Sequence, residues 1–372
     1  MRRSLAPVWL AQPSRFAGAA PRNAWLGLAA LAVLLLATLL VFATPTPAAA
    51  SRDAAQRADD QADVVLYETI VENVRHGGRY YAVAADAMRA GDYPLKPFVT
   101  FRLPTLAMVQ ASLPHGIVVA LLYLLAAAVA MAWYARLAPA FAHAPPRIVA
   151  IALLAGGLMA FVQRDLIAFH EIWGGLFIAL SLAVRRPGAW LPSAAFGLAA
   201  ALIRETAGLY LALMAVLAFL EGERREATGW IVAGLILAAV LALHAQAVAH
   251  VVRPLDPTSP GWSGQLGFGF FIRAMTLSTA LALAPLWLAA PLVGMALFGW
   301  AAWRDPLAMR VLVVLAAYAA VLSVFGRIDT FYWALLIAPL LLIGLAFAPD
   351  GLRDLLAGAL DRRRITVKRI VR

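Results

Sequence analysis

Long apolar stretches alternate with short polar ones over most of this 372-residue chain. Many of the apolar stretches approach the roughly 20 residues that a helix needs to cross a bilayer. Pro285 and Pro291 are expected to kink or break the eighth stretch. The pattern predicts an all-α polytopic bundle of about ten transmembrane helices, over residues 24–44, 116–135, 147–162, 173–185, 191–203, 207–220, 228–249, 280–303, 310–325 and 333–348.

The longest polar interruption, residues 45–115, follows the first apolar stretch. Within it, Tyr67, Ile70, Val71 and Val74 recur at helical spacing, which predicts an amphipathic helix over 61–75 that ends at the following glycine pair. A second short helix is expected over 82–90, and the three prolines after it argue against further regular helix. The interruption is therefore predicted to form a small domain with two surface helices.

Composition agrees with a membrane protein, since 63% of the residues are hydrophobic and only 14% are charged. The length of the first apolar stretch favours a retained helix over a cleavable signal peptide. We expect a single transmembrane domain over 1–348 and a basic cytoplasmic tail over 349–372 that lies against membrane lipids. The chain has no cysteine, which excludes disulfides and thiolate metal sites.

The net charge of +11 is distributed unevenly between the two predicted sides. One side carries 19 of the 31 Lys and Arg but seven of the 20 acidic residues. Because an excess of Lys and Arg marks the cytoplasmic side, we predict two cytoplasmic termini and an extracytoplasmic 45–115 loop. This distribution favours membrane topology over nucleic-acid binding, and the expected location is a bacterial cytoplasmic membrane.

Ionisable and aromatic residues gather at the predicted outer ends of the helices, where charges are costly unless they are paired or face a cavity. Arginines suit phosphate binding, and a carboxylate suits a general base. The alternative is that these residues form interfacial turns and structural ion pairs. The candidate substrate-binding residues are Arg102, Arg164, His170, Glu171, Arg204, Glu205, Arg327, Asp329 and Tyr332.

The order of residues in the first loop resembles that of the GT-C superfamily of membrane glycosyltransferases, notably protein mannosyltransferases and aminoarabinose transferases. The matching positions, in order, are Asp63, Tyr67, Gly77-Gly78, Tyr80-Tyr81, Gly91-Asp92-Tyr93-Pro94 and Arg102-Leu103-Pro104. The resemblance implies a GT-C-like fold, a polyprenyl-phosphate-linked sugar as donor and Asp63 as the catalytic base. Those families often show two adjacent acids, whereas Val64 follows Asp63 here, so Asp60 and Asp86 are rival bases.

The expected function is therefore inverting transfer of a sugar from a polyprenyl-phosphate donor to an extracytoplasmic hydroxyl. A transporter or flippase for a lipid-linked or anionic solute is the main alternative, and a non-catalytic assembly subunit is the third. No cofactor is expected. Metal dependence is left open, although the sequence has no clustered ligand set such as His-x-x-x-His.

Overall fold

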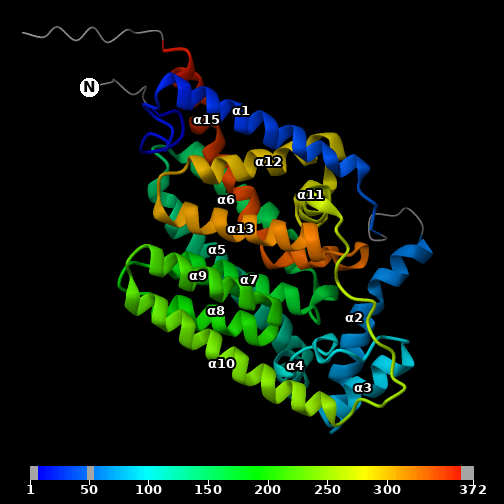
Figure 1. Ribbon diagram of the computed structural model, residues 1–372. Coiled ribbons are helices and arrows are strands. Elements are labelled where there is room, and N and C mark those ends of the chain that lie inside the picture. Colours follow the sequence, from blue (N-terminus) through cyan, green and yellow to red (C-terminus); the bar gives the residue numbers. More distant parts are fainter. Residues whose placement is uncertain (1–6, 48–53, 362–372) are drawn as a thin grey trace, which may run out of the picture.

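The computed structural model describes residues 7–47 and 54–361, with only the backbone described over 54–62 (Figure 1). The described residues form helices and a few isolated bridges, without a sheet. The α-helices are α1 Pro21–Thr38, α2 Ala54–Arg75, α3 Tyr80–Ala90, α4 Thr105–Ser112, α5 His115–Leu137, α6 Ala144–Gly157, α7 His170–Val184, α8 Leu191–Ile203, α9 Gly208–Leu220, α10 Arg224–Ala249, α11 Gly267–Leu277, α12 Leu286–Ala302, α13 Pro306–Phe325, α14 Ala338–Leu341 and α15 Ala348–Ala359.

The helices confirm the prediction of a helical membrane protein. Among the described residues, four helices are long and apolar enough to cross a bilayer: Pro21–Ala43, His115–Ala140, Arg224–Ala249 and Pro306–Phe325. A fifth candidate joins Ile328–Leu336 to Ala338–Ala359 with a bend of 58°. Six shorter apolar helices lie among them in the same bundle. The number of about ten spans and the GT-C-like fold stay predictions.

The loop after the first helix contains the two expected helices, α2 and α3. Ile70, Val74, Tyr80, Ala84 and Met88 pack into a small core of their own, as the amphipathic spacing predicted. The sequence interpretation missed α4, because it treated Pro104 as a barrier to helix. Proline lacks the N–H that helix interiors need but is tolerated where a helix starts, and here it is the N-cap residue of α4.

The prediction that Pro285 and Pro291 kink or break the span over 280–303 holds for the first proline but not for the second. Pro285 caps the start of α12 and separates it from the short turn before it, whereas Pro291 lies inside a continuous helix. The preceding helix, α11, is not among the helices that the sequence predicted. It packs against α12 and α13 and buries Phe270, Phe271 and Ile272, so tertiary contacts outweigh its weak helix propensity.

The basic tail was expected to begin at residue 349. Residues 349–359 belong instead to α15, which packs on α1 and α12. The carboxylate of Asp350 is fully buried and accepts the backbone N–H groups of Val8, Trp9 and Leu10 at 2.7–2.8 Å. This contact holds the N-terminal segment across one end of the bundle. Residues 362–372, the rest of the expected tail, lie outside the described residues.

The two ends of the bundle lie far apart and are built differently (Figure 1). Helices α2, α3 and α4 cover one end, next to the ends of α8 and α10. At the other end, α7, α9, α10 and α13 are joined by buried ion pairs that connect Arg185 and Arg310 with Glu226 and the partly exposed Glu221. Ion pairs thus join the helices at one end of the bundle, and the loop domain covers the other end.

Candidate functional site

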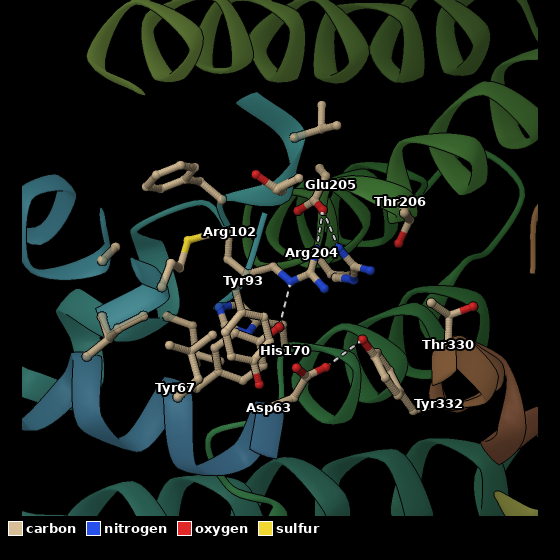
Figure 2. Close-up of a pocket in the computed structure, with 18 of the residues that line it drawn as sticks. Asp63, Tyr67, Tyr93, Arg102, His170, Arg204, Glu205, Thr206, Thr330 and Tyr332 are labelled. Carbon is tan, nitrogen blue, oxygen red and sulfur yellow. Dashed lines mark hydrogen bonds and ion pairs between the residues drawn. The ribbon is translucent and has the colours of Figure 1, made fainter. Parts of the chain in front are cut away.

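A cavity of about 490 Å³ lies where the loop domain meets the bundle. It lies between α2 and α3, the ends of α7 and α13, the turn between α8 and α9, and the turn after α13 (Figure 2). It brings together eight of the ten residues that the sequence singled out: Asp63, Arg102, His170, Arg204, Glu205, Arg327, Asp329 and Tyr332.

Asp63 lies on α2 and points into the cavity toward Tyr332 (Figure 2). The hydroxyl of Tyr332 donates a hydrogen bond of 2.9 Å to Oδ2 of Asp63. No guanidinium lies within ion-pair distance of Asp63 among the described residues, in contrast to Glu205 and Asp329. Asp63 is thus the cavity carboxylate that is held by neutral phenol groups, those of Tyr332 and Tyr93, rather than by a guanidinium.

Arg102 comes from the segment between α3 and α4 and lies under the loop domain. Its Nε donates to the hydroxyl of Tyr67 at 3.0 Å, and its Nη1 donates to Glu205 at 3.2 Å. The hydroxyl of Tyr80 donates to the Arg102 carbonyl at 2.7 Å. The first two contacts fix the guanidinium between the loop domain and the turn that follows α8, and the third fixes the Arg102 backbone.

Arg204 is the most buried of the cavity arginines, with 1% of its surface exposed. Its Nη1 donates a short hydrogen bond to Glu205, and its guanidinium lies over the ring of Trp333 at 5.6 Å. Nε approaches Glu171 to 2.5 Å, although the pair is not aligned as a hydrogen bond. Glu171 is fully buried behind the cavity wall, so it balances the charge of Arg204 rather than reaching into the cavity.

Buried polar atoms without a hydrogen-bond partner in the described chain gather along this inner wall. Buried polar atoms are nearly always paired, so such a group marks a place for a polar ligand or ordered water. It includes both donors and acceptors, which suits a ligand rich in hydroxyl groups. The atoms are Nη2 of Arg204, both ring nitrogens of His170, Oε2 of Glu205, Oγ1 of Thr206 and Nε1 of Trp333.

Arg327 and Asp329 line the cavity at its exposed edge. They form a bidentate pair with distances of 3.1 and 2.9 Å, and 59% of the Asp329 side chain is exposed. An exposed pair of this kind exchanges readily with water and solute, because it is worth at most about 1 kcal/mol. The Arg327 guanidinium is therefore free to exchange its carboxylate partner for an anionic ligand.

Arg164 does not reach the cavity, although the sequence placed it with the other arginines. Its Nε donates to the hydroxyl of Tyr123 at 3.3 Å on an exposed surface. Of the rival bases, Asp86 is 72% exposed, pairs with Arg89 and does not line the cavity. The side chain of Asp60 lies outside the described residues.

Two tyrosines on the cavity wall have perturbed acidity. Burial raises the pKa of Tyr67 to about 12. Burial also raises the pKa of Tyr93, and the charge of Asp63 and a hydrogen bond to Asp63 raise it further. Both phenols are therefore neutral near pH 7 and act as hydrogen-bond donors or acceptors rather than as bases.

Sequence reasoning missed Thr206 and gave no role to Tyr93, although both line the cavity. Thr206 adjoins predicted residues in the same turn, so its position in the chain was a usable signal. Trp333 was expected among the aromatic residues at the outer helix ends, and it also lines the cavity. Tyr93 lies in the Gly-Asp-Tyr-Pro stretch that carried the family resemblance. Tyr67 was part of the amphipathic spacing and of the family resemblance but was given no role in the site, and it lines the cavity together with Asp63.

No group of three or more His, Asp or Glu side chains that could hold a metal ion occurs among the described residues. Comparison of the chain with protein-family models, curated proteins and solved structures found no match.

Proposed function

We propose that this protein is a membrane glycosyltransferase that moves a sugar from a polyprenyl-phosphate donor to an acceptor hydroxyl. The observation that carries the proposal is the position of Asp63 in the same cavity as three arginines and a group of buried polar atoms. Among the described residues, Asp63 has no ion-pair partner and those polar atoms have no hydrogen-bond partner. A base, an anion site and a hydroxyl-binding wall are the parts that this reaction needs.

In the proposed reaction, the acceptor hydroxyl oxygen attacks the anomeric carbon of the donor sugar. The bond between that carbon and the phosphate oxygen breaks, and its electron pair leaves with the polyprenyl phosphate. The proton of the hydroxyl passes to Asp63, and configuration at the anomeric carbon inverts. Tyr332 orients the Asp63 carboxylate through its 2.9 Å hydrogen bond, so that a lone pair faces the acceptor.

The arginines would stabilise the negative charge that develops on the leaving phosphate. Nη2 of Arg204 is buried without a partner, so it can bind a phosphate oxygen without breaking an existing hydrogen bond. Arg102 is held nearby by Tyr67 and Glu205, and Arg327 can release Asp329 at the cavity edge. His170 and Glu205 would contact the sugar hydroxyls.

The position of the cavity supports transfer over transport. Helices α2, α3 and α4 of the loop domain form much of the wall, and most of the bundle's contribution comes from the start of α7, the turn after α8 and the turn after α13. A transporter site is expected near the bilayer midplane, between two related halves. We propose that the cavity opens to the extracytoplasmic side of a bacterial cytoplasmic membrane.

The test is turnover by the purified protein in proteoliposomes that contain a polyprenyl-phosphate sugar labelled in the sugar. Transfer predicts that label moves to a water-soluble or lipid acceptor while free polyprenyl phosphate appears in equal amount. If the intact labelled lipid changes leaflet without release of polyprenyl phosphate, the protein is a flippase and the glycosyltransferase proposal fails.

A further inference from the structure

A second cavity, of about 350 Å³, lies at the opposite end of the bundle from the first. The separation follows from α13, because Pro306 at its start lines this cavity and Phe325 at its end lines the first. A helix of 20 residues is about 30 Å long. The second cavity therefore belongs to a different surface of the protein.

Three segments build this cavity, and two of them end in arginine-bearing turns. One wall is the N-terminal segment, residues 10–13, held in place by the buried Asp350 and by the bridge between Leu10 and Phe141. The second wall is the end of α5 with the turn after it, and the third is the turn from α12 to α13. Arg136 lines the cavity from the last turn of α5, and Arg304 lines it from the turn between α12 and α13.

Positive charge exceeds negative charge at this cavity. No carboxylate lies within ion-pair distance of Arg136 or Arg304 among the described residues. Asp305 also lines the cavity, and its negative charge acts on Arg136. One of its oxygens caps α13 by accepting the N–H of Leu307 at 2.8 Å. The positive charge of Arg186 also acts on Arg136. The described hydrogen bonds of Arg186 go to backbone carbonyls.

Arg136 has an unused donor in addition to its charge. Its Nε is buried and has no hydrogen-bond partner in the described part of the chain. Its place in the last turn of α5 allows a favourable interaction with the helix dipole. The dipole gives no acceptor for Nε, however, so helix capping alone does not explain this guanidinium.

The cavity lies at the membrane surface, because α5 and α13 are both long and apolar enough to cross a bilayer and both end here. Its remaining walls combine apolar residues, with Leu10, Pro139 and Trp303 among them, and the polar Gln12. We infer that this cavity binds a phosphate group, through Arg136 and Arg304, from an anionic phospholipid headgroup or from free phosphate. The site does not depend on the proposed transferase activity.

Thermal unfolding of the full chain in neutral detergent tests the site, with phosphatidylglycerol, phosphatidylcholine or inorganic phosphate added separately. Phosphatidylglycerol is expected to raise the unfolding midpoint by roughly 2–4 °C. The shift should disappear in R136Q/R304Q and persist in R225Q, which removes an exposed arginine at the same end of the bundle. An equal shift with inorganic phosphate alone would identify the free anion as the ligand.

The inference is overturned if phosphatidylcholine and phosphatidylglycerol shift the midpoint equally, if none of the three does, or if R136Q/R304Q shifts as the parent does. Arg304 is exposed, so R304Q alone should fold normally and show a smaller shift than the parent. R136K keeps the charge and is expected to retain most of the shift. These variants keep the test decisive if the double variant does not fold.

Discussion

At the scale of single residues, Asp63 and Tyr332 form the contact on which the proposed chemistry depends. Residues on α2 and on the turn after α13 meet here, although 269 positions separate them in the chain. A hydrogen bond to a charged group is worth about 1.5–3 kcal/mol. Tyr332 therefore contributes to the orientation of Asp63 without neutralising its charge.

Replacement of Tyr332 by Phe is expected to lower kcat about 10- to 100-fold, because the carboxylate loses its oriented donor. The effect should be smaller than that of removing the carboxylate itself. Steady-state kinetics of sugar transfer measure it, with Tyr134→Phe as a control at an exposed position away from the cavity. Equal kcat values for Tyr332→Phe and the parent would exclude this positioning role.

The cavity arginines should separate into structural and exchangeable groups. Arg204→Gln leaves Glu171 buried without its partner, which is expected to cost about 3–5 kcal/mol of folding stability.

Arg327→Gln breaks an exposed pair, so it should cost less than about 1 kcal/mol of folding stability while raising the KM for the donor. Chemical unfolding and donor titrations measure the two effects, and an unchanged KM in Arg327→Gln would remove Arg327 from the site.

At the scale of elements, a strap formed by residues 250–266 joins α10 to α11 over the cavity. Ser259 and Trp262 of the strap line the cavity. Arg89 of α3 holds the strap through two hydrogen bonds to Asp256, at 2.9 and 2.7 Å. The strap also passes so close to Gly326 that a Cβ on Gly264 would clash with its carbonyl.

Arg89→Gln is expected to loosen the strap without unfolding the bundle. Amide hydrogen exchange should then accelerate over 250–262 and stay unchanged in α5 and α13. Arg79→Gln, at an exposed position on the same loop domain, is the matched control. Exchange over 250–262 that matches the parent would show that the Arg89–Asp256 pair does not hold the strap.

The same pair predicts a pH dependence. The hydrogen bond from Arg89 holds the pKa of Asp256 well below its usual range. Because the folded state lowers this pKa, the contribution is present above the ordinary aspartate value of about 3.9 and is lost as the pH falls below it. Protection of the strap, corrected for intrinsic exchange, should therefore be constant from pH 7 to pH 5, and a decline within that interval would contradict the assignment.

How much the sequence predicted can be judged from particular elements. The 3.6-residue spacing around Tyr67 and Ile70 predicted α2 and its buried face, since such spacing depends only on local geometry. The sequence interpretation missed α4 and α11, because short helices with Pro or Gly near their starts owe their stability to tertiary packing. Arg164 was grouped with the other arginines because it also lies at a helix end. That position does not specify which way a side chain faces, and Arg164 does not line the cavity.

At the scale of the whole molecule, the two cavities lie at opposite ends of spanning helices, so the orientation in the membrane determines what each can meet. The sequence predicts that the loop domain is extracytoplasmic. The absence of cysteine from the chain makes this easy to test, since a single introduced thiol is the only one present. Ser112, at the loop-domain end, and Arg225, at the other end, are both exposed.

In intact cells, a membrane-impermeant maleimide is expected to label Ser112→Cys and to leave Arg225→Cys unlabelled until the membrane is opened. The outer membrane must be permeable to the reagent, and a periplasmic control protein checks this. Labelling of Arg225→Cys alone would show that the topology is the reverse of the predicted one and that the first cavity lies on the cytoplasmic side.

Sugar transfer by Asp63→Asn tests the central claim most directly. Asparagine keeps the size of the side chain but cannot accept the proton of the hydroxyl, so the transfer rate is expected to fall by at least about 10²-fold, within the contribution usual for a general base. Asp86→Asn, which alters an exposed rival outside the cavity, should transfer at the parental rate. Undiminished transfer by folded Asp63→Asn would contradict the assignment of Asp63 as the base.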